Sequence, residues 1–427
     1  MEPIILVHGG AGDIPDSRDQ GKHDGVRQAA RIGYSVLRET NSALDAVEAA
    51  VKSMEVDENF NAGYGSVLTL NETVEMEASI MRGADLATGC VTLLRDIKHP
   101  ISLARMTMEP IILVHGGAGD IPDSRDQGKH DGVRQAARIG YSVLRETNSA
   151  LDAVEAAVKS MEVDENFNAG YGSVLTLNET VEMEASIMRG ADLATGCVTL
   201  LRDIKHPISL ARMVMEKTPH NFLGGEGAMD FAREQGVEIL SPPGQLVTEH
   251  AKRALESFKK QQNLGNSQPG KTEIGHEAPV PGEVGTVGAV AIDTAGRIAV
   301  ATSTGGITGK YVGRIGDTPL LGCGTYADDR FGGVSTTGHG ESIMKFVLAK
   351  DIINRIAFQG VTAQQATEEA VKEMTKVTGG TAGAITIDKD GNIGIYFSSK
   401  KMSWAYQKGH EITYGIRHGE SITGRFL

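Results

Sequence analysis

The order of the predicted elements indicates an α+β protein whose helices and sheets stack in layers. A short apolar segment at 110–114 runs into glycines and precedes two helical patterns. Further along, two pairs of apolar segments at 286–304 and 384–397 enclose turns rich in Asp and Gly, with helical patterns between them. Strands, helices, strands and helices in this order are typical of a layered α+β sandwich.

The chain contains an exact internal duplication: residues 1–106 (copy one) recur without a single change as residues 108–213 (copy two). Solenoid repeats are about 20 to 50 residues long and drift in sequence, so a perfect copy of this length is not a repeat architecture. A duplicated exon, a gene-assembly error or an artificial chain would each produce it. Copy two continues directly into the unique remainder at Val214, which favours it as the native segment.

Each copy begins with the same predicted elements. An apolar strand at 3–7 or 110–114 runs into His-Gly-Gly-Ala-Gly, which we interpret as a tight turn that allows close packing. The second helix of each copy follows a serine cap, Ser42 or Ser149, and has apolar residues three and four positions apart. The run 174–188 alternates around residues 178–179 and predicts a hairpin.

The unique remainder adds further helices and two buried hairpins. A helix is predicted near 224–235, and residues 262–285 have the composition of a flexible linker. The segments 286–292 and 297–304 predict one hairpin, and 384–397 predicts the second. Between them, Met344, Leu348, Ile352 and Ile356 predict one continuous helix, and Thr362 with Gln365 predicts a capping box at the start of the next.

The composition excludes several classes of protein. Among 427 residues, 42 Lys+Arg against 55 Asp+Glu give a net charge of −13, and no basic stripe is present, so we expect no nucleic-acid partner. No apolar run approaches the roughly 20 residues that cross a bilayer, so we expect no membrane partner. The first residues lack a basic segment, which predicts a cytoplasmic protein. Cys90, Cys197 and Cys323 form no CxxC motif, as expected for reduced thiols.

Common cofactor motifs are absent from the sequence. The segment 305–310 resembles a phosphate-binding loop but has Thr304 where Gly is needed and Tyr311 where Ser or Thr is needed. The segment 322–327 fails the dinucleotide fingerprint, and no HExxH or Cys/His ligand spacing occurs. We therefore predict no cofactor.

Threonine next to glycine recurs at three places, 285–288, 302–306 and 335–341. Threonine at strand ends also reflects ordinary β-propensity. Together with the upstream linker, however, the clusters suggest a threonine freed at a new N-terminus. An α-amine titrates near pH 8, so at neutral pH a useful fraction accepts the hydroxyl proton without a separate His. Gly285 before Thr286 permits a strained backbone at the bond that must be cut.

These motifs resemble the plant-type L-asparaginase/isoaspartyl peptidase family of N-terminal-nucleophile hydrolases. The resemblance is carried by 285–293, 301–306, 312–317 and 335–341, with 115–119 and 167–172 upstream, and it extends over 108–427. It implies a four-layer αββα sandwich, made as a precursor that cleaves itself at Gly285–Thr286. The predicted parts are a supernumerary segment 1–107, an α chain 108–285 and a β chain 286–427, which pair into an (αβ)2 assembly. A structural sodium ion held by main-chain carbonyls is also common in this fold family.

The resemblance implies a role for each matching residue. Thr286 corresponds to the nucleophile and Thr304 to the threonine that orients it. Arg314 corresponds to the clamp for the substrate α-carboxylate, which suits bidentate guanidinium geometry, and Asp317 to the acceptor for the α-ammonium. The remaining matches line the site: Thr337 and Gly338 on the oxyanion side, Gly340 in the same pocket, and Asn168 near the nucleophile.

Some alternatives stay open on the sequence alone. Arg314 and Asp317 could instead form a surface pair worth under about 1 kcal/mol. His339 suggests a catalytic triad, but the resemblance gives it no such role, and we interpret it as structural. The predicted function is hydrolysis of L-asparagine and of β-aspartyl dipeptides through an ester on Thr286. An aspartylglucosaminidase-like amidase and an unprocessed, inactive scaffold are the alternatives.

The duplication raises a further question, because the family pattern has one α segment per active site. Asn61 and Asn168 occupy the same position in the two copies and cannot both face Thr286. If copy one stays outside, it exposes an apolar strand and half-covered helices, which favours aggregation or domain swapping. We hypothesise that copy one displaces copy two in some molecules. Deleting residues 1–107 tests this, and unchanged solubility and cleavage would count against it.

Overall fold

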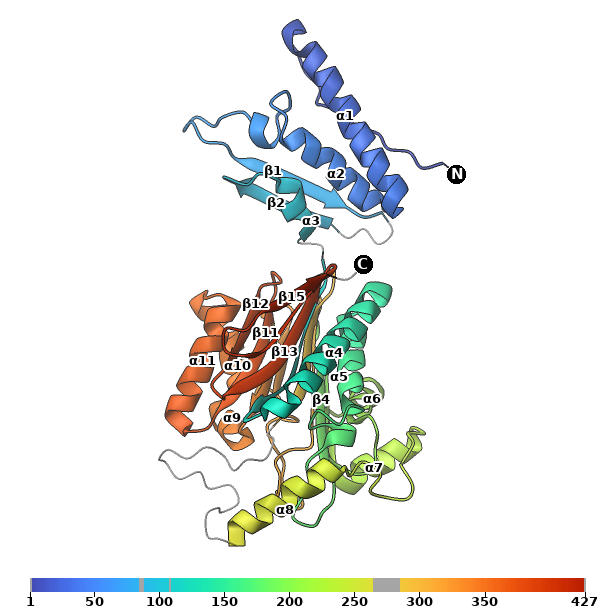
Figure 1. The fold of residues 1–427 in the computed structure, drawn as a ribbon, viewed down its shortest axis with the longest axis vertical. Coiled ribbons are helices and arrows are strands. Elements are labelled where there is room, and N and C mark those ends of the chain that lie inside the picture. Colours follow the sequence, from blue (N-terminus) through green and yellow to red (C-terminus); the bar gives the residue numbers. More distant parts are fainter. Residues whose placement is uncertain (1, 84–87, 107–108, 264–284, 426–427) are drawn as a thin grey trace. The chain divides into compact units, whose positions relative to one another are not determined.

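The computed structural model describes residues 2–83, 88–106, 109–263 and 285–425. The chain divides into two compact units, Met1–Glu109 and Pro110–Leu427 (Figure 1). The first unit contains copy one. Its helices are α1 (Asp16–Thr40), α2 (Ala43–Glu55) and α3 (Pro100–Met106), and its strands β1 (Met76–Met81) and β2 (Thr88–Leu94) pair in antiparallel orientation.

The second unit contains copy two and the unique remainder, built on two sheets. Within the described residues, the larger sheet has nine strands in the order β15-β14-β13-β3-β7-β8-β4-β5-β6, and the smaller has four in the order β12-β11-β10-β9. The larger sheet consists of β3 (Ile111–Gly119), β4 (Met183–Arg189), β5 (Thr195–Leu201), β6 (Phe222–Gly224), β7 (Val287–Ile292), β8 (Ile298–Thr304), β13 (Lys401–Lys408), β14 (Glu411–Arg417) and β15 (Ile422–Arg425). The smaller consists of β9 (Thr325–Asp328), β10 (Gly332–Gly338), β11 (Ala382–Asp388) and β12 (Ile393–Phe397).

Helices cover the outer faces of both sheets (Figure 1). Helices α4 (Asp126–Thr147), α5 (Ala150–Glu162) and α6 (Pro207–Lys217) share one apolar cluster with the larger sheet, to which α7 (Gly225–Glu234) and α8 (Glu249–Asn263) also contribute. A second cluster lies between the two sheets. A third joins the smaller sheet to α9 (Gly340–Phe346), α10 (Leu348–Gln359) and α11 (Ala363–Thr378). The predicted α+β sandwich, with layers in the order helix, sheet, sheet, helix, is confirmed.

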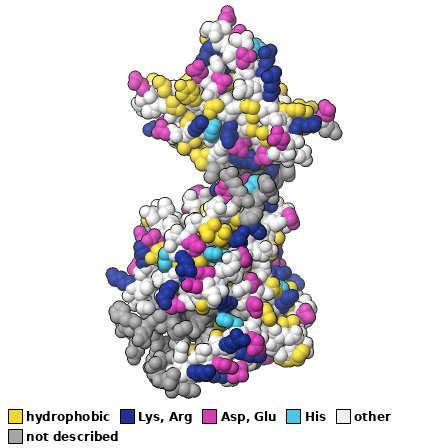
Figure 2. Space-filling view, viewed as in Figure 1, with side chains coloured by type: hydrophobic (Ala, Val, Ile, Leu, Met, Phe, Trp, Pro, Cys, Tyr) yellow, Lys and Arg dark blue, Asp and Glu magenta, His cyan; other side chains and the backbone are white. Residues whose placement is uncertain are grey.

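The identical apolar segments at the start of each copy have different structures. In copy two the segment forms β3, which lies between β13 and β7, and Ile111 and Leu113 are almost fully buried. In copy one the same residues form no strand, and Ile4 and Leu6 are 83% and 94% exposed. Figure 2 shows hydrophobic side chains grouped on the surface of this first unit. A strand requires neighbouring strands for its main-chain hydrogen bonds, so the strand predicted at 3–7 is wrong and that at 110–114 is confirmed.

The capped helices, in contrast, form in both copies. Ser42 and Ser149 each accept a hydrogen bond, from the amides of Asp45 and Asp152 respectively, and each begins the helix that the sequence predicts. The environment of these helices differs, since Val154 on α5 is fully buried while its counterpart Val47 on α2 is 39% exposed. Local sequence is enough to form the helix, but burial of its apolar face needs the larger sheet.

Two predictions for copy two are wrong. The His-Gly-Gly-Ala-Gly segment is not a turn but the second half of β3, because its backbone continues to pair with β13 across a register shift. The run 174–188 is not a hairpin either. Its arms meet only near the turn, through the Leu175–Val181 bridge and the hydrogen bonds between Thr176 and Thr180, while β4 pairs with β5 and β8. Residues 175–177 instead exchange main-chain hydrogen bonds with Gly309 and Lys310, far along the chain.

In the remainder, one prediction needs correction and several are confirmed. The helix predicted across 344–356 is two helices, α9 and α10, separated by Val347 at φ 55°. The break allows the first amides of α10 to reach the carbonyls of Cys323 and Gly322. The β7–β8 and β11–β12 hairpins and the Thr362–Gln365 capping box are confirmed, as is α7. Most of the predicted linker, 264–284, lies outside the described residues.

Two further observations concern the chain as a whole. Cys90, Cys197 and Cys323 are all free thiols, the first exposed and the other two buried. Across the described segments, none of the helices combines the length and the hydropathy that a membrane span requires.

Candidate active site

Thr286 lies directly before β7, in the middle of the larger sheet, and is 6% exposed. Its hydroxyl donates a hydrogen bond to the hydroxyl of Thr304 across 3.1 Å. Thr304 ends the neighbouring strand β8, and the antiparallel pairing of Val287 with Ser303 places the two threonines at the same end of the hairpin. The predicted nucleophile and its predicted orienting partner are therefore in direct contact.

Thr337 reaches the same point from the smaller sheet. Its Oγ1 accepts a hydrogen bond from the Thr286 amide at 3.2 Å and another from the Ala118 amide of β3 at 3.2 Å. Gly338, which ends β10, has φ 135° and packs closely against the Thr381 carbonyl. One hydroxyl thus connects both sheets at the start of β7.

The glycines of β3 lie against the peptide bond that is predicted to be cut. A Cβ atom placed on Gly117 would be 2.4 Å from the Cα of Gly285 and 3.2 Å from the nitrogen of Thr286, closer than van der Waals contact permits. Gly117 also has φ 101°, a conformation that side chains disfavour. Copy two therefore supplies one wall of the Gly285–Thr286 site.

Asn168 lies beside this site and holds its neighbours through three hydrogen bonds. Its side-chain amide donates to the Gly306 carbonyl at 2.7 Å, its side-chain oxygen accepts from the Val174 amide at 2.9 Å, and its main-chain carbonyl accepts from the Gly305 amide at 3.1 Å. Its counterpart Asn61 is exposed and keeps only the local bond, from the Val67 amide at 3.0 Å.

Arg314 and Asp317 are not a surface pair, because the Arg314 side chain is only 14% exposed and Asp317 is 5% exposed. The guanidinium binds the carboxylate of Glu341 in bidentate fashion, with distances of 3.0 and 3.1 Å. A Cβ on Gly340 would lie 2.6 Å from Arg314 Nη2 and 2.9 Å from Asp317 Oδ1. Any side chain at position 340 would therefore collide with both head groups, which approach each other at this glycine.

Burial changes the charge of Asp317. Desolvation raises its pKa to about 7, although the nearby guanidinium of Arg314 opposes the shift. The hydroxyl of Thr336 donates to its Oδ2 at 3.3 Å. Near neutral pH, the carboxylate is therefore poised between its neutral and charged forms.

A buried chain of hydroxyl groups behind Thr286 was not predicted. The Nε2 atom of His115 lies 2.9 Å from the Ser335 hydroxyl, which lies 2.8 Å from the hydroxyl of Thr302. Burial lowers the pKa of His115 to about 3, so its ring is neutral at physiological pH. Gly288 is required here, because a Cβ would lie 2.0 Å from the Ser335 hydroxyl. His115 and Ser335 lie in the glycine-rich motifs 115–119 and 335–341, and this position was the signal available in the sequence.

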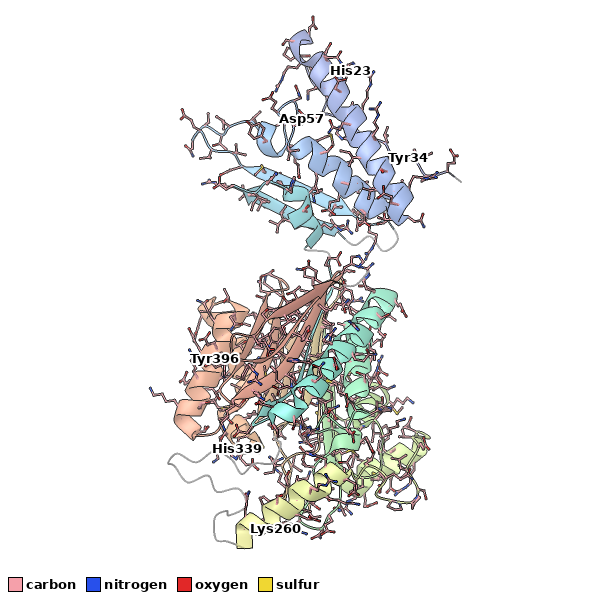
Figure 3. All side chains as sticks on the ribbon, viewed as in Figure 1. His23, Tyr34, Asp57, Lys260, His339 and Tyr396 are labelled. Atoms are coloured by element: carbon pink, nitrogen blue, oxygen red, sulfur yellow. The ribbon has the colours of Figure 1, made fainter. Side chains whose placement is uncertain are left out.

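His339 lies directly before α9 (Figure 3). Its Nδ1 is 2.8 Å from the Ser342 hydroxyl, and its Nε2 is 3.7 Å from a Glu341 oxygen. It thus contacts the residue that holds Arg314, while the amide and the hydroxyl of Thr286 bind the hydroxyl groups of Thr337 and Thr304.

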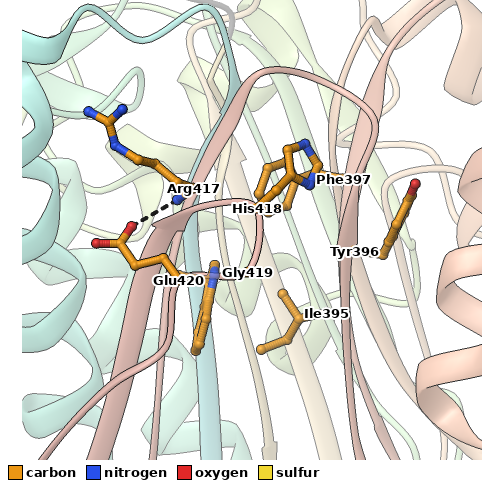
Figure 4. A pocket seen from close by; sticks show the side chains of 8 residues that line it. Ile395, Tyr396, Phe397, Arg417, His418, Gly419 and Glu420 are labelled. Carbon is orange, nitrogen blue, oxygen red and sulfur yellow. Dashed lines mark hydrogen bonds between the residues drawn. The ribbon is translucent and has the colours of Figure 1, made fainter.

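A pocket elsewhere in the second unit contains none of the predicted site residues. It is lined by residues 395–397, 417–420 and Trp404, with Phe397 and His418 stacked and the Arg417 amide bound to Glu420 (Figure 4). In the parts of the chain that the structure describes, no group of three or more His, Cys, Asp and Glu side chains is placed to hold a metal ion. That observation does not concern main-chain carbonyls, so the sodium ion stays a prediction.

Comparison with known proteins agrees with this geometry. The asparaginase family model matches residues 1–110 and again residues 108–416, one match for each copy. A probable isoaspartyl peptidase/L-asparaginase of Drosophila melanogaster is 54% identical over 329 residues, which cover 74% of this chain and 98% of the relative. The isoaspartyl peptidase/L-asparaginases of Xenopus laevis and Homo sapiens are each 46% identical, covering 74% and 72% of this chain and 97% and 96% of their own lengths. The chain therefore belongs to the asparaginase family.

Proposed function

We propose that the protein is an autoprocessing threonine amidohydrolase that converts L-asparagine to aspartate and ammonia and cleaves β-aspartyl dipeptides. The observation that carries the proposal is the position of Thr286. Its amide and its hydroxyl are held by two other threonines at the start of a central strand, directly after Gly285. The relatives named isoaspartyl peptidase/L-asparaginase support the same substrates.

Maturation begins with attack of the Thr286 hydroxyl oxygen on the Gly285 carbonyl carbon. The C–N bond breaks as the nitrogen takes a proton, leaving an ester between Gly285 and the hydroxyl. Water then hydrolyses this ester, which gives a carboxylate on Gly285 and a free α-amine on Thr286. The close contact of Gly117 with this peptide supports the assignment, since it restricts where the bond can lie.

Turnover uses the amine that maturation exposes. The unprotonated amine accepts the Thr286 hydroxyl proton as the oxygen attacks the side-chain carbonyl of the substrate. Hydrogen-bond donors on the Thr337–Gly338 side stabilise the oxyanion. Ammonia, or the amine of the second amino acid, leaves with a proton, and water activated by the same amine hydrolyses the β-aspartyl ester.

Arg314 and Asp317 select substrates with a free amino-acid head. The guanidinium binds the α-carboxylate and the Asp317 carboxylate accepts from the α-ammonium. Gly340 has no side chain that would crowd these two head groups. A small molecule or dipeptide fits this arrangement, whereas a large protein substrate would lack the two free α-groups.

The remaining parts of the proposal concern assembly and location. The two chains remain together because β3 and β4, from the α chain, pair with β7, β8 and β13 of the β chain. Pairing into an (αβ)2 assembly, a structural sodium ion and a cytoplasmic location follow from the family resemblance and the composition.

Intact mass spectrometry after incubation, with Thr286→Ala as the control, tests the proposal. We expect a fragment of residues 286–427 that the control lacks, together with ammonia release from L-asparagine. Only the full-length mass, with no hydrolysis, would favour the inactive scaffold. A higher kcat/KM on glycosylated asparagine than on L-asparagine would favour the aspartylglucosaminidase-like amidase.

A further inference from the structure

The segment that presents Arg314 and Asp317, residues 305–317, is an irregular loop that we call the clamp loop. It belongs to the predicted β chain but is anchored by copy two. Besides the bonds at Asn168, the Gly309 amide donates to the Leu175 carbonyl and the Leu177 amide donates to the Lys310 carbonyl, each at 2.9 Å. The position of the clamp loop therefore depends on the α chain.

Two glutamates of copy two hold the part of the clamp loop nearest to the substrate groups. Glu182 accepts from the Gly313 amide at 2.9 Å. Glu184, on β4, accepts from the Gly316 amide with both carboxylate oxygens, at 3.1 and 3.0 Å. These two amides lie directly before Arg314 and directly before Asp317. The glutamates thus fix the backbone at both predicted substrate contacts.

Glu184 is fully buried, so its ionised form must be compensated by its surroundings. Burial raises its pKa, while the charges of Lys310 and Arg314 lower it. A Cβ on Gly316 would lie 2.7 Å from Arg314 Nη1 and 3.2 Å from Glu184 Oε2, which places guanidinium and carboxylate on the same side of that glycine. Lys310 is also buried, and its ammonium donates to the Glu182 carbonyl at 2.6 Å.

The Nε–Nη2 edge of the guanidinium binds Glu341. Arg314 is therefore bonded to a carboxylate of the predicted β chain and also interacts electrostatically with Glu184 of copy two. Glu341 is only partly buried, with a side chain 30% exposed. Glu184, in contrast, is fully buried, binds the loop backbone and interacts electrostatically with Arg314. These contacts hold the guanidinium in one orientation, in which it can bind the α-carboxylate of the substrate.

We infer that Glu184 is a positioning residue for substrate recognition: its buried carboxylate holds the clamp loop so that Arg314 and Asp317 meet the α-groups of the substrate. The inference rests on the proposed hydrolysis of L-asparagine. It predicts that loss of the charge weakens ground-state binding, while the reaction at Thr286 and its maturation proceed as before.

The test compares Glu184→Gln and Glu184→Asp in the full chain. Gln keeps the shape and one acceptor oxygen but removes the charge, whereas Asp keeps the charge but is one methylene shorter. We expect KM for L-asparagine and the inhibition constant of the product L-aspartate to rise by about 10-fold or more in Glu184→Gln, since the acceptor of the Gly316 amide loses its charge. We expect kcat to stay within about 2-fold and the effect of Glu184→Asp to be smaller.

Glu77→Gln is the matched control, because Glu77 is the same sequence position in copy one and is exposed. It should change none of these quantities. Unchanged KM and inhibition constant in Glu184→Gln would overturn the inference, as would a loss confined to kcat or to the extent of self-cleavage. If Glu184→Gln does not fold, Glu184→Asp decides alone: a raised KM with normal kcat supports the inference and a wild-type KM overturns it. An inactive wild-type protein would instead refute the proposed function.

Discussion

Substitution of Gly117 by Ala should slow maturation strongly, whereas the same change at Gly10 should not. The two glycines occupy the same position in identical sequences and have similar backbone angles, φ 101° and φ 96°. The strain of placing an alanine at positive φ, about 1–2 kcal/mol, therefore applies equally to both variants. They differ in what the new methyl group would meet.

At Gly117 the added Cβ would lie 2.4 Å from the Cα of Gly285, whereas at Gly10 no heavy atom lies within 4 Å. Relief of the contact to a normal carbon–carbon separation of about 3.5–4.0 Å requires a shift of about 1 Å or more at the peptide to be cut. Displacement of that size costs about 100-fold in rate when reacting groups must be aligned. We therefore expect self-cleavage of Gly117→Ala to be slower by about this factor.

The assay is a time course of the 286–427 fragment on denaturing gels, with Gly10→Ala and Thr286→Ala in parallel. Gly10→Ala should mature like the wild type. Maturation of Gly117→Ala at the wild-type rate would refute the reasoning from the contact distance. The reverse pattern, with Gly10→Ala impaired, would show that copy one takes the place of copy two beside Thr286.

Two further predictions use the same structure. The pKa of Asp317, raised to about 7 by burial, means that its carboxylate is neutral below and charged above that pH. KM for L-asparagine should therefore fall as the pH rises through about 7, and Asp317→Asn should abolish this dependence in steady-state kinetics. Leu175→Ala should destabilise the second unit by about 2–5 kcal/mol, because Leu175 is fully buried. Leu68→Ala, at a counterpart that is 62% exposed, should cost under about 0.5 kcal/mol, and equal losses in denaturant unfolding would contradict the difference in burial.

Much of the candidate site could be located from the sequence. Thr286, Thr304 and Thr337 each lie next to a glycine and within one residue of a strand end, and the structure brings them into one hydrogen-bonded group. Arg314 and Asp317 lie three positions apart on one loop, so the sequence was enough to predict that they are close together. The carboxylates that hold this loop were not predicted. Glu341 binds Arg314 from 27 residues away, Glu184 binds the Gly316 amide from 132 residues away, and no local pattern relates them.

The duplication distinguishes, within one molecule, what the local sequence determines from what contacts with distant residues determine. Identical residues form α1 and α4, α2 and α5, and the hairpins β1–β2 and β4–β5 in both copies. Helix caps, helical periodicity and hairpin pairing act over a few residues, so the sequence by itself determined these elements. The segment that becomes β3 beside the β7 and β13 strands has no strand structure in copy one.

Only the tertiary structure decided which copy contributes to the site. Gly117 contacts Gly285, and Asn168 binds Gly306, while their counterparts Gly10 and Asn61 have neither contact. A strand completes its hydrogen bonds only between neighbours, and an apolar face loses water only against another such face. Those neighbours come from residues 286–427, so the same sequence is a wall of the candidate active site in one position and exposed surface in the other.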